Sequence, residues 1–271
     1  MQGRLLPKYK GRYQAHPLNY WQKEFELAQE IGLDCIEFIL DFNDAEINPL
    51  LLNRGIDEIK SVSDKTGVEV NTICADYFMD APLHSKNPLV AENSQLIMKR
   101  LLYSSKEIGI TDIVLPCVDH SSLDSKDAIE RFVKYLTPLL EIAEKLDINF
   151  SLETDLAPLP FVELLDKFDS DKVVVNYDIG NSASLGYNPV EEFESYGEYI
   201  TDIHIKDREF NGGSVFLGSG NVNFDIFFNK LKEINYKGPF IMQAYRDDNG
   251  LDIFINQLDW INKYFTKYNY K

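Results

Sequence analysis

Apolar, strand-like runs alternate with amphipathic helical patterns along the whole chain. The eight runs that we interpret as strands are Gly3–Leu6, Cys35–Leu40, Val68–Cys74, Asp112–Cys117, Asn149–Glu153, Val173–Asp178, Asp202–Lys206 and Phe240–Gln243. They are rich in Val, Ile and Phe, which favours buried strands. Regular alternation with helices is typical of parallel βα units. The pattern therefore predicts an α/β protein, a single (β/α)8 TIM barrel that forms one domain over residues 1–271.

The expected helices carry start and stop signals. Asn48-Pro49, Asn87-Pro88 and Asn188-Pro189 each pair a capping side chain with proline at the first helical position. Gly32 and Gly67 directly follow apolar helical patterns, where glycine favours a C-terminal stop. We expect helices to begin and end at these positions.

Two connections between expected strands and helices are long. Asp76–Lys86 follows the third expected strand, and Arg208–Val222 follows the seventh. In a βα barrel the loops after the strands lie on the face that carries the active site. We expect these two loops to form a substrate pocket or its lid.

Composition and charge narrow the choice of partner. The chain has 271 residues, of which 44% are hydrophobic, and its 44 acidic and 27 basic residues give a net charge of −17. This charge repels nucleic acid over most of the surface. The start, MQGRLLPKYK, is not apolar, and no window approaches the roughly 18 apolar residues of a membrane span. We expect a cytoplasmic protein with no nucleic-acid and no membrane partner.

Four residues that can bind a divalent metal end successive strand-like runs. They are Glu153, Asp178, His204 and Gln243, and their separations are 25 (178 minus 153), 26 (204 minus 178) and 39 (243 minus 204) residues. Each separation is close to one βα unit, so the four side chains are expected to meet at the carboxyl ends of neighbouring strands. Two carboxylates, an imidazole and an amide oxygen suit Mn²⁺, Mg²⁺ or Co²⁺.

Each of these residues also has a structural interpretation. Asp178 can cap the helix that follows it, and His204 can be a hydrogen-bonded core histidine. Gln243 can form ordinary hydrogen bonds without binding a metal. Glu153 is the hardest to explain in this way, because a lone carboxylate on an apolar strand is costly to bury without a partner.

Further candidates lie on or near other strand ends. Glu37, in the run CIEFIL, is either a substrate ligand or a second acid/base, or it pairs with Arg4 on the first expected strand. Lys206 and Asp207 follow His204, where they can reach a substrate hydroxyl or hold the histidine in place, and Lys206 can also act as an acid. The residues expected to contact substrate are Arg4, His84, His120, Arg208 and Arg246.

Four motifs give the chain a family resemblance. They are LET at 152–154, YDIGN at 177–181, HIKD at 204–207 and GSGNVNF at 218–224. Together with the eight-unit rhythm, they resemble the xylose-isomerase-like TIM-barrel superfamily of sugar and sugar-phosphate isomerases and epimerases. Tagatose 3-epimerase, ribulose-phosphate 3-epimerases, hydroxypyruvate isomerase, inosose dehydratase and the endonuclease IV branch belong to that superfamily.

The resemblance implies a ligand set for one divalent ion. In the family, a glutamate, an aspartate, a histidine and a second glutamate on strands five to eight hold the metal, which implies Glu153, Asp178 and His204 here. The fourth position falls on Gln243, a departure, since glutamine can bind through its amide oxygen but cannot accept a proton at neutral pH. Mn²⁺ is the first choice for the ion, with Mg²⁺, Co²⁺ and Zn²⁺ as alternatives.

The resemblance also implies the reaction. We expect an isomerase or epimerase that acts on a small sugar or sugar derivative, phosphorylated or not. Glu153 would abstract the proton next to a carbonyl, the metal would stabilise the enediolate, and Glu37 or Lys206 would be the further acid/base. Dimers are frequent among the relatives, so a homodimer is expected by analogy.

Three alternatives to this reaction stay open. A dehydratase of the inosose-dehydratase type needs only one base and one acid. A nuclease of the endonuclease IV branch is disfavoured by the charge and by the shortage of histidines. The third alternative is a barrel that binds a sugar but has lost activity, because Gln243 replaces the family glutamate.

Overall fold

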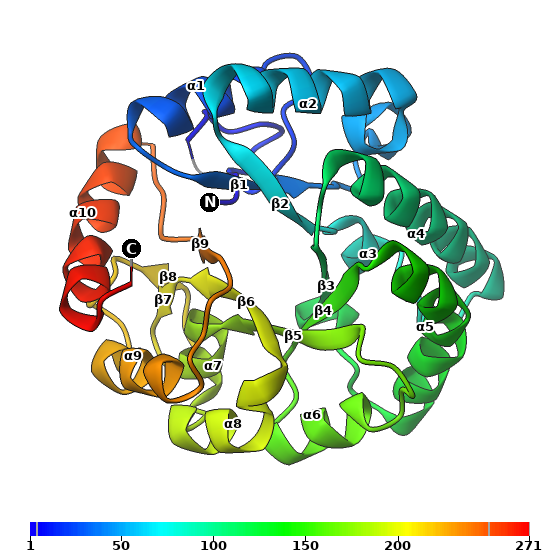
Figure 1. The fold of residues 1–271 in the computed structure, drawn as a ribbon. Helices are drawn as coiled ribbons and strands as arrows, with labels where there is room; N and C mark the ends of the chain where they lie inside the picture. The colour runs from blue at the N-terminus through cyan, green and yellow to red at the C-terminus, as the bar shows by residue number, and fades with distance from the viewer. Residues whose placement is uncertain (4, 249, 271) are drawn as a thin grey trace.

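Seven parallel strands form one curved sheet around a central axis in this computed structural model, which describes residues 1–3, 5–248 and 250–270 (Figure 1). They are β1 (Cys35–Ile39), β2 (Glu69–Cys74), β3 (Asp112–Cys117), β4 (Asn149–Thr154), β5 (Val173–Asp178), β6 (Ile200–Ile205) and β9 (Phe240–Met242). Their order in the sheet follows the order in the chain, as repeated βα units require. The predicted α/β barrel is confirmed.

The first predicted strand is wrong for the residues that the structure describes. Gly3 adopts a left-handed φ of 53°, so the extended chain ends at Gln2. The first two residues nevertheless bridge the gap between β9 and β1. The Gln2 N–H donates to the Met242 carbonyl (3.2 Å), and the Glu37 N–H donates to the Met1 carbonyl (2.8 Å). The barrel is therefore nearly closed, with a short bridging segment in place of an eighth strand.

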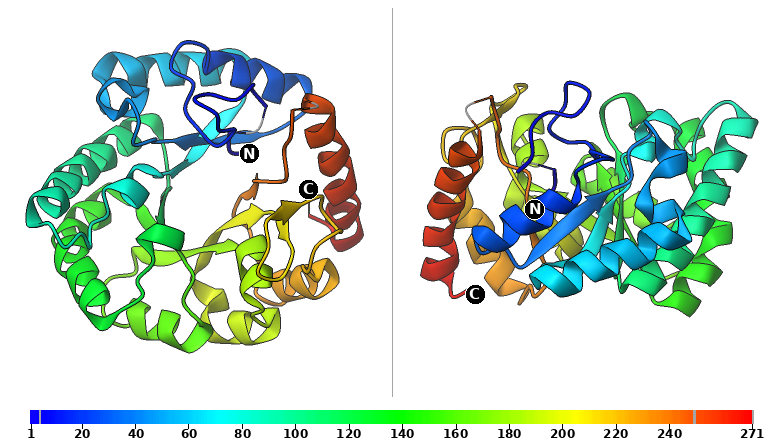
Figure 2. Two further views of the ribbon diagram at one scale, coloured as in Figure 1. Left: turned by 180° about the vertical axis from the view of Figure 1, so that it is seen from behind. Right: turned by 90° about the horizontal axis from the view of Figure 1, so that it is seen from above.

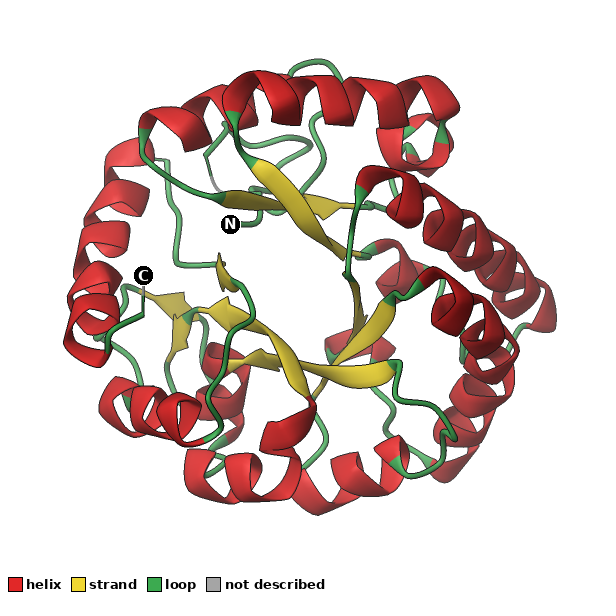
Figure 3. Ribbon diagram, viewed as in Figure 1, coloured by secondary structure: helices red, strands yellow, loops and turns green. Residues whose placement is uncertain are grey.

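Helices surround the sheet and form the outer layer (Figure 3). They are α1 (Gln22–Glu30), α2 (Asn53–Thr66), α3 (Tyr77–Asp80), α4 (Pro88–Ile108), α5 (Lys126–Leu146), α6 (Pro158–Leu165), α7 (Ile179–Leu185), α8 (Pro189–Tyr196), α9 (Phe224–Glu233) and α10 (Leu251–Tyr268). Short 3-10 turns are η1 (Ala45–Ile47), η2 (Pro49–Leu51), η3 (Asp119–Ser121) and η4 (Gly197–Tyr199). None of the helices in the described ranges combines the length and the apolar content that crossing a membrane requires.

The predicted helix signals are confirmed, with one difference in helix type. Asn87 and Asn188 accept backbone N–H groups at the starts of α4 and α8, at 3.1 and 3.0 Å. Asn48 accepts the Leu50 N–H at 3.0 Å, but it caps the short turn η2, and α2 begins only at Asn53. Gly67 ends α2 with a φ of 71°. Local capping chemistry thus sets most helix boundaries.

Strand register brings the candidate ligands to one level of the barrel. Along β4, Phe150 and Leu152 belong to the apolar core between sheet and helices, while Glu153 alternates with them and faces the interior. On the neighbouring strands β5 and β6, Asp178 lies directly opposite His204. The ends of three adjacent strands therefore present their side chains to the same space.

The long loops lie beyond the carboxyl ends of the strands (Figure 2). The loop Asp76–Lys86 contains α3. The loop Arg208–Val222 begins within a small hairpin, which is formed by β7 (Asp207–Arg208) and β8 (Ser214–Val215). The Asp207 carboxylate accepts the backbone N–H groups of Gly218 and Gly220, both at 2.9 Å. This bond network folds the second loop back over the end of β6.

Gly55 provides a test of the packing between η2 and α2. A Cβ added there would lie 2.4 Å from the backbone of Pro49. Glycine to alanine in an exposed helix usually stabilises by about 1 kcal/mol, but overpacking against backbone costs about 1–3 kcal/mol. We expect Gly55→Ala to lower the free energy of unfolding, measured by denaturant titration.

The control for this change is Gly213→Ala, since nothing lies within 4 Å of a Cβ added at that loop position. It should leave the denaturation midpoint almost unchanged. A Gly55→Ala protein as stable as the parent would contradict the close packing of η2 on α2.

Candidate metal and active site

Glu153, Asp178 and His204 converge at the carboxyl ends of β4, β5 and β6. One ligand atom of each lies within 4.8 Å of the others. His204 Nδ1 is 3.9 Å from Glu153 Oε2 and 3.9 Å from Asp178 Oδ2. All three side chains are buried. The structure thus brings together three of the four predicted metal ligands.

The three side chains fit a divalent ion. In the described part of the chain, His204 Nδ1 is buried and has no hydrogen-bond partner, which is unfavourable unless a ligand completes it. Separations of 3.9 Å exceed a hydrogen bond, and they suit atoms that each bind one ion at about 2.0–2.2 Å. Two carboxylates and an imidazole form a hard, mixed oxygen and nitrogen set.

The other nitrogen of His204 is held by Glu37. His204 Nε2 lies 2.9 Å from Glu37 Oε1, and the Thr72 hydroxyl donates to Glu37 Oε2 at 2.9 Å. A proton on Nε2 leaves the Nδ1 lone pair free for a metal, the usual arrangement for a ligating histidine. Glu37 is buried, and burial raises its pKa to about 7.

The position of Glu37 bears on the roles predicted for it. Its side chain does not line the large pocket, although Glu153 and Lys206 do. It pairs instead with His204, which lies 167 residues further along the chain, on β6. The alternative pair with Arg4 lies outside the described residues, because Arg4 is not among them.

Asp178 both caps a helix and faces the candidate metal position. Its Oδ1 accepts the backbone N–H groups of Gly180 and Asn181 at 2.9 and 2.8 Å, which starts α7. Its Oδ2 lies 2.6 Å from Lys206 Nζ. Burial opposes ionisation, but Lys206 and His204 outweigh it and hold the pKa of Asp178 below its ordinary value. The capping interpretation and the ligand interpretation therefore apply to different oxygens.

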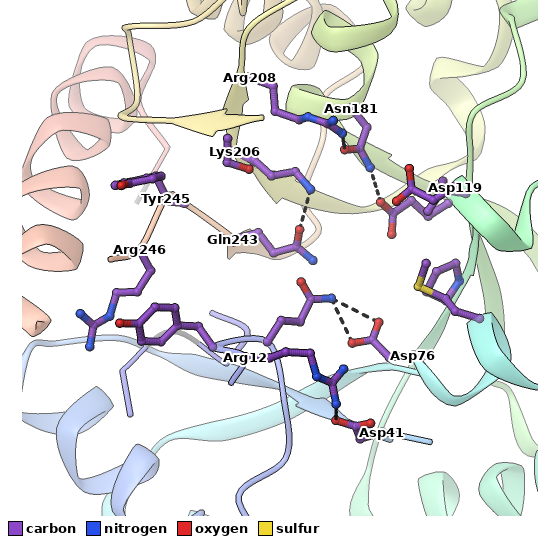
Figure 4. Close-up of a pocket in the computed structure, with 18 of the residues that line it drawn as sticks. Arg12, Asp41, Asp76, Asp119, Asn181, Lys206, Arg208, Gln243, Tyr245 and Arg246 are labelled. Atoms are coloured by element: carbon purple, nitrogen blue, oxygen red, sulfur yellow. Dashed lines mark hydrogen bonds and ion pairs between the residues drawn. The ribbon is translucent and has the colours of Figure 1, made fainter. Parts of the chain in front are cut away.

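Gln243 is bound to Lys206 in this structure. Lys206 Nζ donates to Gln243 Oε1 at 2.9 Å (Figure 4), and Gln243 Nε2 donates to Gln2 Oε1. The amide oxygen thus faces the lysine that also pairs with Asp178. Gln243 is buried at the end of β9.

Glu153 is oriented by a chain of two side chains. Asn181 Nδ2 donates to Glu153 Oε1 at 2.6 Å, and Arg208 Nη1 donates to Asn181 Oδ1 at 2.7 Å (Figure 4). These bonds leave Oε2 facing His204. Burial, reinforced by the charge of Asp178, raises the pKa of Glu153 to about 7. One oxygen is therefore held by the protein while the other faces the metal position.

A cavity of about 590 Å³ opens above these residues. Glu153, Lys206 and Gln243 form part of its wall, and both long loops contribute to it. Its volume lies within the range of about 300–1,000 Å³ found for small-molecule sites. The prediction that the long loops form a pocket is confirmed.

The predicted substrate contacts fall into two groups. His120, Arg208 and Arg246 line the cavity. His84 does not line the cavity, and its ring packs edge-to-face on Phe132. Burial lowers the pKa of His84 to about 4. The remaining one, Arg4, lies outside the described residues.

Several residues at the site were not predicted from the sequence. Arg12 and Gln14 come from the segment before α1 and line the cavity beside their partners Asp41 and Asp76. Asn181 belongs to the YDIGN motif. Its position three residues after Asp178 could have indicated that it lies beside the candidate metal ligands. Nothing in the sequence marks a bond from Gln243 to the second residue of the chain.

Comparison with known proteins places this fold and site in a family. The family model described as "Xylose isomerase-like TIM barrel" matches residues 25–264. A putative L-ribulose-5-phosphate 3-epimerase, SgbU, of Haemophilus influenzae is 26% identical over 247 residues, covering 84% of this chain and 85% of that protein. The L-ribulose-5-phosphate 3-epimerase UlaE of Salmonella heidelberg is 24% identical over 256 residues, covering 89% and 88%.

Solved structures show the same fold. A D-tagatose 3-epimerase-like protein superposes with a TM-score of 0.74 and 22% identity, covering 90% of this chain and 92% of that chain. The IOLI protein with a binding zinc atom has a TM-score of 0.75 and 18% identity, covering 91% and 93%. Because the family model spans most of the chain, from 25 to 264, the protein belongs to the xylose isomerase-like TIM barrel family.

Proposed function

We propose that the protein is a divalent-metal-dependent sugar epimerase or isomerase that moves a proton next to a carbonyl group. The observation that carries this proposal is the convergence of Glu153, Asp178 and the unpartnered Nδ1 of His204 beneath a sugar-sized cavity. The homologous sugar epimerases support the reaction class.

Each residue of the site has a task in this reaction. An ion held by Glu153, Asp178 and His204 would polarise the substrate carbonyl and stabilise the negative charge that develops on its oxygen. Glu153 lines the cavity with Oε1 fixed by Asn181, so it is the carboxylate positioned to take the proton. Glu37 is a positioning residue that orients His204.

Lys206 is the second polar group at the reacting centre. It lines the cavity, and its Nζ lies between Asp178 and Gln243. We infer that it binds a substrate oxygen and serves as the acid, because Gln243 carries no proton to exchange. Gln243 in turn holds the lysine in place through its amide oxygen.

The substrate in this proposal is a small ketose or ketose phosphate. Two similar proteins bear the name L-ribulose-5-phosphate 3-epimerase. Arg208, Arg246 and His120 line the cavity and supply donors for hydroxyl or phosphate oxygens. Mn²⁺ as the ion and a cytoplasmic location complete the proposal.

A dehydratase on the same scaffold is the second candidate. It is favoured by one observation: the side chain at 243, which is a glutamate in the family, is here an amide bonded to Lys206. One base and one acid suffice to remove a proton and a hydroxyl group. Mass spectrometry of the product separates the two reactions, because epimerisation conserves mass and dehydration removes one water.

Metal binding is tested first. His204→Ala should abolish stoichiometric metal binding, measured by calorimetry and elemental analysis, because it removes the only imidazole of the triad. Asp178→Asn keeps the oxygen that caps α7 and should weaken binding strongly in a folded protein. Asp119→Asn, a cavity carboxylate outside the triad, is the control and should bind metal normally. Full occupancy in His204→Ala would exclude the proposed site.

Gln243→Glu tests the departure from the family pattern. It adds a negative charge beside the triad, and Gln2 can turn its buried, unpartnered Nε2 toward the new carboxylate. We expect metal binding to tighten roughly ten- to a hundredfold, and 3-epimerase activity to appear or rise. Gln243→Met, which is similar in shape but lacks the oxygen, is the control for loss of the amide. Weaker metal binding in Gln243→Glu would place this side chain outside the coordination shell.

The role of Glu153 is tested with Glu153→Gln, which keeps one oxygen for the metal. Turnover and deuterium uptake from D₂O, measured over a panel of ketoses and ketose phosphates, should fall by roughly 10²–10⁴-fold. Glu37→Gln is the comparison: its metal affinity should fall by about 10–100-fold, while turnover at saturating metal persists. Deuterium uptake at the parent rate in Glu153→Gln would rule out Glu153 as the base.

A further inference from the structure

Helix α4 carries an apolar stripe on the side that faces away from the barrel. Leu89, Leu96 and Tyr103 follow one another at intervals of seven residues, and they are 74%, 67% and 45% exposed. The 21 residues of α4 extend over about 31 Å on the outside of the barrel (Figure 1). The opposite face, with Met98 and Leu101, already packs on the core. The outer stripe therefore has no partner within the described fold.

Two further exposed apolar side chains lie on the segment that packs against α4. Ile47, the last residue of η1, and Leu52, the residue after η2, are 53% and 41% exposed. The turn η2 packs against α4, and the Arg100 side chain donates to Asn53, the residue after Leu52. Exposed apolar side chains that are grouped in this way mark a protein–protein contact more often than single exposed ones do.

The stripe is symmetric about Leu96. Leu89 lies seven residues before it and Tyr103 seven residues after it. On one flank of the helix, Glu92 precedes Leu96 by one turn and Lys99 follows it by about one turn. Among the residues described, neither Glu92 nor Lys99 makes an ion pair. A second α4 laid antiparallel across the first would place Glu92 opposite Lys99 twice.

Charge along the helix also favours a second copy of the same chain. Two molecules of net charge −17 repel each other over most of their surfaces. Helix α4 is an exception, because its three basic residues outnumber its two acidic residues. The basic residues are Lys99, Arg100 and Lys106, and the acidic residues are Glu92 and Glu107. Self-association through α4 would thus bring together a part of the chain that is less acidic than the whole.

We propose that α4 is the contact surface of a homodimer, in which two copies of α4 pack antiparallel about a twofold axis at Leu96. A twofold interface must be complementary to itself, and both the stripe and the flanking charges meet this condition. Leu96 meets its own copy at the axis, and Leu89 packs against the Tyr103 of the second molecule. A stable interface needs about 800 Å² from each copy, which requires Ile47 and Leu52 beside the helix as well.

The oligomeric state is the first test. Sedimentation equilibrium across a concentration series should give twice the chain mass of 31.2 kDa for the parent protein. Leu96→Glu places two carboxylates together at the axis and should give a monomer with unchanged circular dichroism and metal content. Leu159→Glu, at a leucine of α6 that is 71% exposed, is the matched control and should remain dimeric. A monomeric parent, or a dimeric Leu96→Glu protein, would overturn the proposal.

Charge reversal and cross-linking test the antiparallel arrangement. Glu92→Lys and Lys99→Glu should each weaken the dimer by about fivefold or more, and the double variant should restore it. A short bismaleimide should cross-link Leu96→Cys into a dimer but should not cross-link Leu159→Cys, with the parent cysteines as background. Absence of rescue together with absence of the Leu96→Cys cross-link would overturn this geometry, as would capture of a different protein by a monomeric chain.

Discussion

The His204 imidazole is the group on which the rest of the site depends, because buried carboxylates lie on both sides of it. Nε2 is bonded to Glu37 of β1, and Nδ1 faces Glu153 of β4 and Asp178 of β5. Buried carboxylates are costly unless a donor or cation satisfies them. The ring therefore joins strands from opposite sides of the barrel and fixes the distance between the candidate ligands.

Charge balance explains why this centre suits a divalent cation. Glu37, Glu153, Asp178 and Asp202 are all buried near His204, and Lys206 forms an ion pair with Asp178. Lys206 keeps the pKa of Asp178 low, whereas burial raises the pKa of Glu37 and of Glu153 to about 7. These two carboxylates are therefore costly to ionise unless more positive charge lies beside them. An ion bound at Nδ1 of His204 would supply it.

The sequence predicted what depends on local pattern and on strand spacing. Glu153, Asp178 and His204 meet because each ends a strand and the strands are adjacent in register, as their spacing of about one βα unit indicates. The bonds that hold these residues could not be predicted in the same way. Glu37 lies 167 residues from His204, and Gln2 lies 241 residues from Gln243. Such contacts depend on how the barrel closes, and here Met1 and Gln2 bridge the gap between β9 and β1 in place of the predicted first strand.

The glutamine at 243 changes the chemistry of the centre through Lys206. A glutamate at this position would form an ion pair with the lysine and draw it away from Asp178. The neutral amide instead accepts one hydrogen bond at 2.9 Å and leaves the positive charge of Lys206 to Asp178, 2.6 Å away. The proposed ligand set then carries two carboxylates in place of the three that the family pattern implies. Proton transfer on the second face of a substrate would therefore fall to the ammonium group of Lys206. Which substrate atom lies beside that group would then decide between epimerisation and dehydration.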